Sequence, residues 1–387
     1  MPPARSSNQT LRELAGLFLK LGTIAFGGPA AHVAMMEDEV VRRRKWLTHA
    51  EFLDLLGATN LIPGPNSTEM AIHIGHRRAG WAGLIIGGVC FILPAMLIVT
   101  AIAWAYVRYG KLPEANALLY GVKPVIIAVV VQALWSLGRT AVKTKTLAVV
   151  GMVALVACFL GVNELIILFL TGFAMIPLKA VDSKKQNAAF LPLLVGAPSA
   201  AAAVVASGAA TVPFSLNLMF FFFLKVGAVL FGSGYVLLAF LRADLVERWG
   251  WLTENQLLDA IAVGQFTPGP VFTTATFIGF ILSGPMGALL ATVGIFLPAF
   301  VFVAVSAPLI PKLRTAPAAG AFLDGVNVAS LALMAVVTWQ LSASALVDWI
   351  TVLLAILATA ALLLWRLNSV WLVLAGGAVG FIKYLFG

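Results

Sequence analysis

The chain alternates between long apolar runs and short polar stretches. Two of the runs, Trp81 to Val107 and Pro285 to Ile310, contain no charged residue. An apolar run of about 18 residues or more is typical of a helix that crosses a membrane. The pattern therefore predicts an all-α integral membrane protein, with two sets of six membrane segments. We place them at residues 14–36, 52–75, 81–107, 117–138, 146–161 and 163–179, and at 216–241, 256–282, 284–310, 319–342, 346–365 and 368–386.

Composition agrees with a membrane protein. Hydrophobic residues make up 61% of the chain and charged residues 11%, whereas a soluble domain carries about 25% charged residues. The net charge is +9, but most Lys and Arg lie in short loops between apolar runs, where they orient the chain. We therefore expect contact with lipid and none with nucleic acid. The two cysteines, Cys90 and Cys158, are too few for a thiolate metal site, and we expect no metal or cofactor.

The two sets of segments are copies of one sequence. Phe18-Leu-Lys-Leu-Gly22 returns as Phe223-Leu-Lys-Val-Gly227, 205 residues later. Coincidence between apolar stretches does not easily place Lys, Asp and Pro-Gly-Pro at one offset, so we infer a duplication. At offset 205 the further matches are Phe26-Gly27 with Phe231-Gly232, Trp46-Leu-Thr48 with Trp251-Leu-Thr253, Asp54 with Asp259, and Pro63-Gly-Pro65 with Pro268-Gly-Pro270; at offset 204 they are Ile74-Gly75 with Ile278-Gly279, Leu93-Pro-Ala95 with Leu297-Pro-Ala299, and Gly121-Val122 with Gly325-Val326.

We divide the chain into a first repeat, 1–180, a linker, 181–213, and a second repeat, 214–387. The linker contains an Ala-rich apolar stretch, Phe190 to Ala210. If that stretch crosses the membrane, the second repeat is upside down relative to the first.

The distribution of charge favours the inverted arrangement. Cytoplasmic loops are richer in Lys and Arg. With a cytoplasmic N-terminus and a crossing linker, 15 loop cations lie inside and 7 outside; without the crossing, the count is 11 against 11. We therefore predict inverted repeats and an extracytoplasmic C-terminus. The outside cluster Arg42 to Lys45 fits poorly, and would move inside if the first two segments were re-entrant hairpins, a variant that also keeps the repeats inverted.

Two helix breakers recur at matched places. The first is Phe26-Gly-Gly-Pro29, matched by Phe231-Gly-Ser-Gly234, and the second is Pro-Gly-Pro. Proline inside a helix removes a hydrogen bond and clashes with the preceding turn. Broken helices in corresponding positions of two repeats indicate a transporter's binding site, although a kink kept for packing is the alternative.

The helices around Pro-Gly-Pro have recognisable starts. Thr48 with Glu51, and Thr253 with Gln256, fit capping boxes. After each break the chain restarts, at Asn66 and at Val271, and a restarting helix offers unpaired N–H groups to an anion. We therefore predict an anion site at mid-membrane. Its candidate substrate-binding residues are Lys20, Lys225, Gly27, Gly28, Asn60, Gly64, Asn66, Ser67, Thr68, Gly232, Ser233, Gln265, Gly269 and Thr273.

Lys20 and Lys225 are equivalent by repeat and lie inside apolar runs. Ionisable residues within membrane segments are costly and indicate function. We predict that both lysines face a shared central cavity and bind a doubly charged anion; the alternative is that they extend to the membrane surface.

Three carboxylates are candidates for proton coupling: Glu69, Asp54 and Asp259. Asp54 and Asp259 could also pair with the two lysines, or simply lie near a helix N-terminus, where the helix dipole favours them. Glu69 has only Thr273 or Thr274 opposite it in the second repeat.

The ordered set of Phe-Gly-Gly-Pro, Trp-Leu-Thr and Pro-Gly-Pro, with its partners in the second repeat, resembles the chromate ion transporter family in its long, two-domain form. The resemblance covers Leu11 to Phe386. It implies inverted repeats, a bacterial inner-membrane location and efflux of chromate, with sulfate as a competitor. Phe-Gly-Ser-Gly in place of Phe-Gly-Gly-Pro departs from the pattern, so the two repeats need not contribute equally.

The leading interpretation is a secondary transporter, since no phosphate-binding Gly-x-x-x-x-Gly-Lys loop is present. An anion channel, or a carrier of another oxyanion such as sulfate, is the alternative, because a dianion leaves a negative interior downhill. No His-Glu-x-x-His or other catalytic pattern supports an enzyme. A homodimer is compatible with the sequence but not indicated by it.

Overall fold

The computed structural model describes residues 7–26, 28–110, 112–184, 212–231, 234–306, 317–365 and 367–386. These residues form helices and no strands, as the sequence predicts. The helices of the first repeat are α1 (Ser7–Ile24), α2 (Gly28–Glu37), η1 (Asp38–Arg43), α3 (His49–Thr59), α4 (Asn66–Tyr109), α5 (Pro113–Ala141), α6 (Lys145–Phe159) and α7 (Glu164–Lys184). Those of the second are α8 (Leu216–Val229), η3 (Gly234–Val236), α9 (Leu237–Phe240), η4 (Leu241–Arg248), α10 (Glu254–Phe266), η5 (Val271–Thr273), α11 (Thr274–Ser306), α13 (Pro317–Ala345), α14 (Trp349–Leu364) and α15 (Ser369–Phe386).

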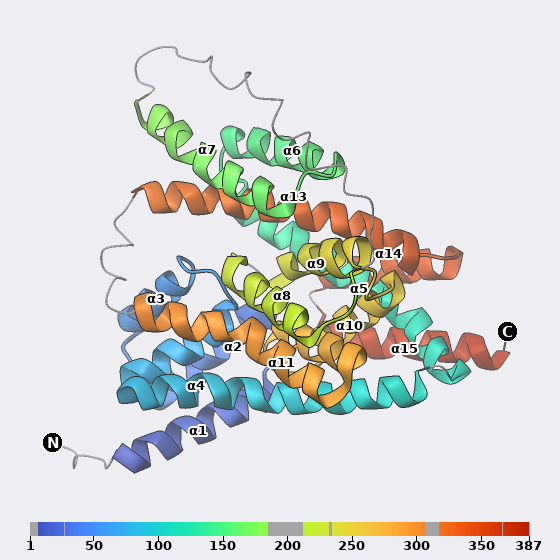
Figure 1. Ribbon diagram of the computed structural model, residues 1–387, viewed down its shortest axis with the longest axis horizontal. Coiled ribbons are helices and arrows are strands. Elements are labelled where there is room, and N and C mark those ends of the chain that lie inside the picture. Colours follow the sequence, from blue (N-terminus) through green and yellow to red (C-terminus); the bar gives the residue numbers. More distant parts are fainter. Residues whose placement is uncertain are drawn as a thin grey trace.

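Five of the described helices are long and apolar enough to cross a membrane. They are Asn66–Tyr109, Pro113–Ala141, Val271–Ser306, Ala318–Ala345 and Ser369–Phe386. Their long axes run in roughly the same direction (Figure 1), and α1 begins at the end of the molecule opposite to the end where α15 finishes.

Two of these helices contain a sharp reversal. In α4, Ala79 and Gly80 leave helical geometry, so the element consists of helices 66–78 and 81–109. The two pack so closely that a Cβ atom on Gly75 would lie 2.1 Å from the carbonyl oxygen of Gly83. In α11 the same reversal falls at Ser283 and Gly284. The sequence predicted these as separate segments, and the structure places each pair side by side.

The first two segments of the first repeat enter and return on the same side. Glu13, near the start of α1, lies 3.9 Å from Arg78, at the end of helix 66–78. The Arg78 guanidinium also lies over the ring of Trp46, which precedes α3, and Arg77 bonds Glu51 at 3.1 Å. Because both ends of both segments meet here, each segment turns back on itself as a hairpin, which matches the re-entrant variant that the sequence left open.

The second repeat forms the same first hairpin. The Nε1–H of Trp251, which follows η4, donates to the carbonyl oxygen of Val212, which precedes α8, at 2.7 Å. Nearby, Arg248 lies 3.4 Å from Glu164, the first residue of α7. Val212 therefore lies near the first residue of α7, whereas Lys184 is its last residue. The two ends of the linker are thus about 30 Å apart, the length of α7 at the helical rise. The predicted crossing, 190–210, lies outside the described residues.

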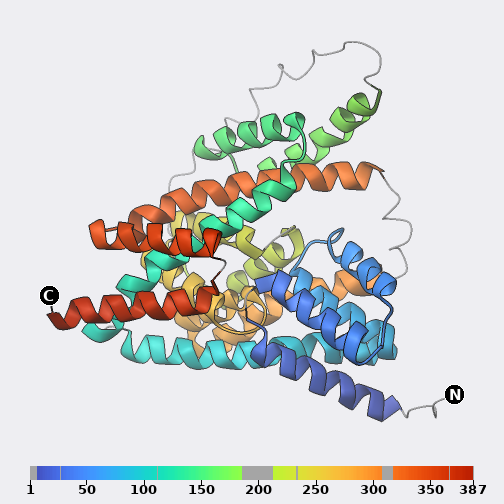
Figure 2. The same cartoon turned by 180° about the vertical axis from the view of Figure 1, so that it is seen from behind.

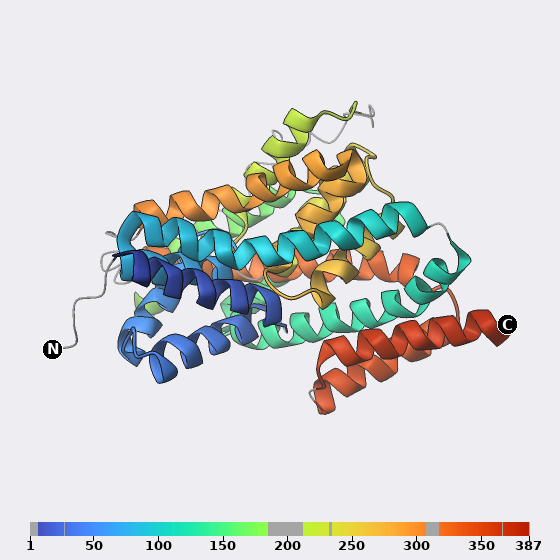
Figure 3. The same cartoon turned by 90° about the horizontal axis from the view of Figure 1, so that it is seen from below.

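The repeats are antiparallel and exchange helices. Leu84 of α4 contacts the same cluster as Val303 of α11, and Gly88 faces Phe300, so helices 81–109 and 285–306 run in opposite directions. Figure 2 shows α13 of the second repeat lying along α6 and α7 of the first. Figure 3 shows the converse, α5 of the first repeat beside α15 and α14 of the second. The repeats are therefore intertwined.

Candidate functional site

The two Pro-Gly-Pro breaks lie between helices whose starts are well capped. Both predicted capping boxes are confirmed, with Thr48 accepting from the Glu51 N–H and Thr253 from the Gln256 N–H. Helix α3 ends at Thr59 and α4 begins at Asn66. The corresponding helix, α10, ends at Phe266, and α11 follows a single 3₁₀ turn. Each break is therefore an interruption of the helix, as predicted, and not a bend.

The breaks of the two repeats are joined by reciprocal backbone hydrogen bonds. The Gly64 N–H donates to the Leu230 carbonyl oxygen at 2.7 Å, and the Gly269 N–H donates to the Ala25 carbonyl oxygen at 2.9 Å. The two donors are 205 residues apart in sequence, and so are the two acceptors. Ala25 and Leu230 directly follow α1 and α8, where the first hairpin of each repeat turns. Each repeat thus satisfies the backbone at the other's break.

The Leu-Pro-Ala motifs complete this interlock. A Cβ atom on Gly64 would lie 3.7 Å from Ala299, and one on Gly269 would lie 2.6 Å from Ala95. The φ angles are +140° at Gly64 and +87° at Gly269, values that favour glycine. Both breaks thus require glycine for conformation. Both also require it for space, because a Cβ atom on Gly64 would lie 2.2 Å from Oε1 of Glu69.

Glu69 lies in the first turn after the first break and is fully buried. Within the described part of the chain, neither of its carboxylate oxygens has a hydrogen-bond partner. Two buried neighbours on the same helix, the Thr68 hydroxyl and Nε2 of His73, also lack one. In the second repeat, Thr273 donates its hydroxyl to the carbonyl oxygen of Pro270 at 2.8 Å. Unsatisfied polar groups therefore gather at the first break, where an anion or a proton would find partners.

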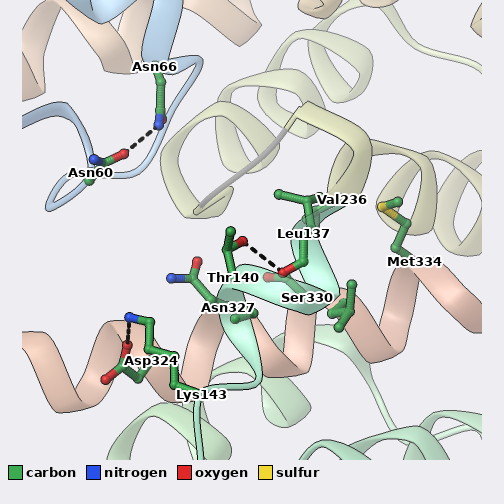
Figure 4. Close-up of a pocket in the computed structure, with 12 residues that line it drawn as sticks. Asn60, Asn66, Leu137, Thr140, Lys143, Val236, Asp324, Asn327, Ser330 and Met334 are labelled. Atoms are coloured by element: carbon green, nitrogen blue, oxygen red, sulfur yellow. Dashed lines mark hydrogen bonds and ion pairs between the residues drawn. The ribbon is translucent and has the colours of Figure 1, made fainter. Parts of the chain in front are cut away.

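A cavity of about 370 Å³, lined by both polar and apolar side chains, opens beside the first break. Figure 4 shows Asn60 and Asn66 on one side and Asn327 and the Lys143–Asp324 ion pair on the other. Asn66 donates to the side-chain oxygen of Asn60 at 2.9 Å. The complete lining is Asn60, Asn66, Leu137, Thr140, Ala141, Lys143, Val236, Asp324, Asn327, Ser330, Leu331 and Met334. Two predicted site residues, Asn60 and Asn66, are therefore brought together at a cavity.

The two predicted lysines are each paired within their own repeat. Lys20 Nζ lies 2.7 Å from Glu39, and Lys225 Nζ lies 2.7 Å from Asp244. The cavity beside Lys20 is lined by residues 20–43 alone, so it does not include Lys225. The Lys20 ammonium, followed by Arg44, holds the pKa of the Glu39 carboxyl below its usual value. The anion-binding role of both lysines stays a prediction.

Glu39 and Asp244 were missed from the sequence, although they too stand 205 residues apart. So do Arg43 and Arg248, which pair with the same carboxylates. Extending the repeat comparison to acidic residues after each first hairpin would have found them.

The predicted aspartates have different surroundings. Asp259 is buried and lies 3.3 Å from Lys123 and 2.8 Å from the Tyr106 hydroxyl, which donates to it. Asp54 is exposed on α3. Lys20 and Lys225 pair with Glu39 and Asp244, whereas the sequence had suggested Asp54 and Asp259 as their partners.

The remaining candidates surround the breaks. Ser67 and Thr68 are buried in the first turn of α4, Gln265 is the penultimate residue of α10, and Gly28 begins α2 with a φ of +78°. Gly27, Gly232 and Ser233 lie outside the described residues.

Comparison with known proteins gives consistent matches over both repeats. The family model described as chromate transporter matches residues 12–176 and 217–381. A chromate transport protein of Cupriavidus metallidurans is 34% identical over 383 residues, covering 97% of this chain and 94% of that protein. A chromate transport protein of Pseudomonas aeruginosa is 32% identical, covering 99% and 94%. A probable chromate transport protein of Synechococcus elongatus is 32% identical, covering 90% and 89%. No solved structure matches.

Proposed function

We propose that this chain, which belongs to the chromate transporter family, is a secondary transporter that exports chromate across a bacterial inner membrane. The substrate is inferred from the relatives, three of which are named for chromate transport. Sulfate, a tetrahedral dianion of similar shape, is the expected competitor. Export is the direction in which the membrane potential drives a dianion, because the interior of the cell is negative.

The single observation that carries this proposal is the reciprocal bonding of the two breaks, Gly64 to Leu230 and Gly269 to Ala25. Inverted repeats with broken helices at their interface are the arrangement that secondary transporters use for a central substrate site. The N-terminus of helix 66–78 supplies N–H groups that favour an anion. The adjoining cavity with Asn60 and Asn66 supplies room and amide donors.

Glu69 is proposed to carry the coupled proton. It is fully buried at the first break and has no hydrogen-bond partner among the described residues. A carboxylate without a partner is costly to bury in its charged form, and binding a proton removes that cost. Release of the proton on one side and uptake on the other would couple the proton gradient to anion movement.

The orientation is proposed from charge. Because the first two segments of each repeat return to the side they entered, Arg42 to Lys45 move inside and Arg242 and Arg248 move outside. The loop cations then number 17 inside against 5 outside. This imbalance favours a cytoplasmic N-terminus and an extracytoplasmic C-terminus, more strongly than the count with spanning segments did.

Flux of radiolabelled chromate and sulfate into proteoliposomes tests the proposal. A proton-coupled transporter accumulates chromate against its gradient when a pH gradient is imposed, and unlabelled sulfate slows the uptake. Equilibration that follows the membrane potential alone, with no accumulation driven by pH, would instead identify an anion channel. Absence of flux for both anions would reject the proposed substrate class.

A further inference from the structure

Asp324 lies between two lysines at the edge of the cavity beside the first break. Its Oδ1 atom is 3.2 Å from Nζ of Lys143 and its Oδ2 atom is 2.8 Å from Nζ of Lys179. The three residues come from the α5–α6 loop, α7 and α13. Two ammonium groups share one carboxylate, so the cluster keeps one positive charge that no described residue neutralises.

Only Lys143, of the two lysines, lines the cavity. Among the described lining residues it is the one cation, and Asp324 is the one anion. Asn327 and Ser330 follow Asp324 at successive three-residue steps along α13, and all three line the cavity. The Ser330 hydroxyl is buried and has no partner in the described structure. A buried donor without a partner is costly to leave unsatisfied, and here it borders the same space as the ammonium.

We propose that Lys143 is the cation that captures the oxyanion in this cavity, and that Asp324 is the internal anion that the substrate displaces. The proposal rests on the proposed function and assigns its cavity a binding residue. The tetrahedral oxygens accept hydrogen bonds from Lys143, the Asn327 amide and the Ser330 hydroxyl, while Lys179 keeps Asp324 neutralised. Lys143 leaves Asp324 readily because its side chain is 62% exposed, and exposed ion pairs contribute little.

The displaced carboxylate gives a preference for dianions. A monoanion offers Lys143 the same charge as Asp324 does, and it arrives without the advantage of being tethered. A dianion such as chromate or sulfate offers twice the charge and can outcompete the tethered carboxylate. Asp324 therefore acts as a filter against singly charged anions as well as a resting partner for Lys143.

The equivalent place in the other repeat lacks the surplus charge. At offset 204, Asp324 corresponds to Tyr120, Lys179 to Lys383 and Lys143 to Val347. There Asp348 binds Lys383 at 2.7 Å and accepts from the Tyr120 hydroxyl. One lysine and one carboxylate balance each other, so that cluster is a closed ion pair. The Asp324 cluster, at the cavity, differs from the Asp348 cluster by its second lysine, Lys143.

The test is equilibrium binding of chromate and of sulfate to the purified full-length protein by titration calorimetry. Lys143→Gln should weaken binding about tenfold or more, the loss expected for one hydrogen bond from a charged donor. Asp324→Asn should tighten binding, because it removes the competing anion and frees both lysines. Lys145→Gln, two residues further on at the start of α6 and also exposed, should leave affinity unchanged.

The opposite signs of the two effects exclude a purely structural role. If the cluster only clamps α13 to α7, both variants weaken binding alike, and the proposal is overturned. Parent-like binding by Lys143→Gln, in a variant that melts like the parent, overturns it as well. A parent protein that binds neither oxyanion refutes the proposed function itself, which separates that failure from a failure of the role of Lys143.

Discussion

Lys20 and Glu39 form an ion pair of 2.7 Å, and their counterparts at offset 205, Lys225 and Asp244, form another of the same length. The Lys20 side chain is 48% exposed and that of Glu39 9%. The pair therefore has two interpretations: the lysine keeps a buried carboxylate neutralised, or it waits for an anion. Each predicts a different response to exchange of the two side chains.

The double variant Lys20→Glu/Glu39→Lys preserves the pair but reverses its direction. If the pair only stabilises the hairpin, the exchange should restore most of the stability lost in Lys20→Met and also restore transport. That loss is on the order of 1 kcal/mol or more, because the lysine is half exposed but the carboxylate that it neutralises is buried. If Lys20 binds the anion, stability returns but chromate flux does not. Thermal unfolding and proteoliposome flux, measured on the same preparations, separate the two.

Glu69→Gln should retain anion binding and lose the dependence of transport on a pH gradient. The amide has nearly the same shape as the carboxyl group but cannot release a proton in this range. Chromate uptake should then respond to the membrane potential alone. Glu51→Gln, near the start of α3 and with its side chain 41% exposed, serves as the control for loss of a carboxylate. Retention of the full pH response in Glu69→Gln would remove this residue from the coupling mechanism.

Gly269→Ala should be more damaging than Gly28→Ala. Both glycines have positive φ, +87° and +78°, so both variants incur backbone strain of about 1–2 kcal/mol. Only at Gly269 would the new Cβ atom lie 2.6 Å from Ala95, whereas nothing lies within 4 Å at Gly28. Overpacking adds about 1–3 kcal/mol. Equal melting temperatures for the two variants would show that the close contact between the repeats does not limit stability.

The re-entrant hairpins predict which loops face the cytoplasm. In a variant without Cys90 and Cys158, a cysteine at Lys45 should react with an impermeant maleimide only in inside-out vesicles. A cysteine at Arg248, which lies after the first hairpin of the second repeat, should react only in intact spheroplasts. Labelling of both from the same side would exclude inverted repeats, and labelling of Lys45 from outside would require the first segments to span the membrane.

Asp348 predicts a loss of stability in acid. Lys383 and Tyr120 donate to its carboxylate, and they hold its pKa well below the usual range. A lowered pKa in the folded state stabilises the protein above the unfolded pKa, near 4, and the benefit is lost as pH falls through the folded value. Asp348→Asn should therefore have a lower melting temperature than the parent at pH 7. The difference between the two melting temperatures should narrow below about pH 4. A difference in melting temperature that does not change with pH would show that Asp348 stabilises the protein as the N-cap of α14 and not through its charge.

The repeat comparison predicted much of the molecule because it aligned features that are local in sequence. Capping boxes at Thr48 and Thr253, the helix interruptions at Pro-Gly-Pro and the membrane helices follow from spacing alone. The partners of Lys20 and Lys225 did not follow, because contact with a carboxylate 19 residues away depends on the segment turning back. Whether it turns back is decided by contacts such as Arg78 with Glu13.

The candidate site was predicted in part for the same reason. Asn60 and Asn66 flank a breaker and were found from it. Lys143 comes from the first repeat, whereas Asp324 and Ser330 come from α13 of the second, and only the exchange of helices between repeats brings them to one cavity. Asp324 nevertheless carried a signal, because a charged residue inside an apolar segment indicates function.

The exchange of helices also sets the order in which the protein can be completed. Helix α5 packs on α14 and α15, which leave the ribosome after the other described helices. At about 5–20 residues per second, the ribosome needs on the order of 10–40 s to travel from the end of α5 to the start of α14. During that time the face of α5 that α14 and α15 will cover meets lipid, chaperones or other chains. A chain truncated before Trp349 would leave that face permanently uncovered. Proteins truncated by late nonsense mutations should therefore be removed by membrane quality control, although their first repeat is complete.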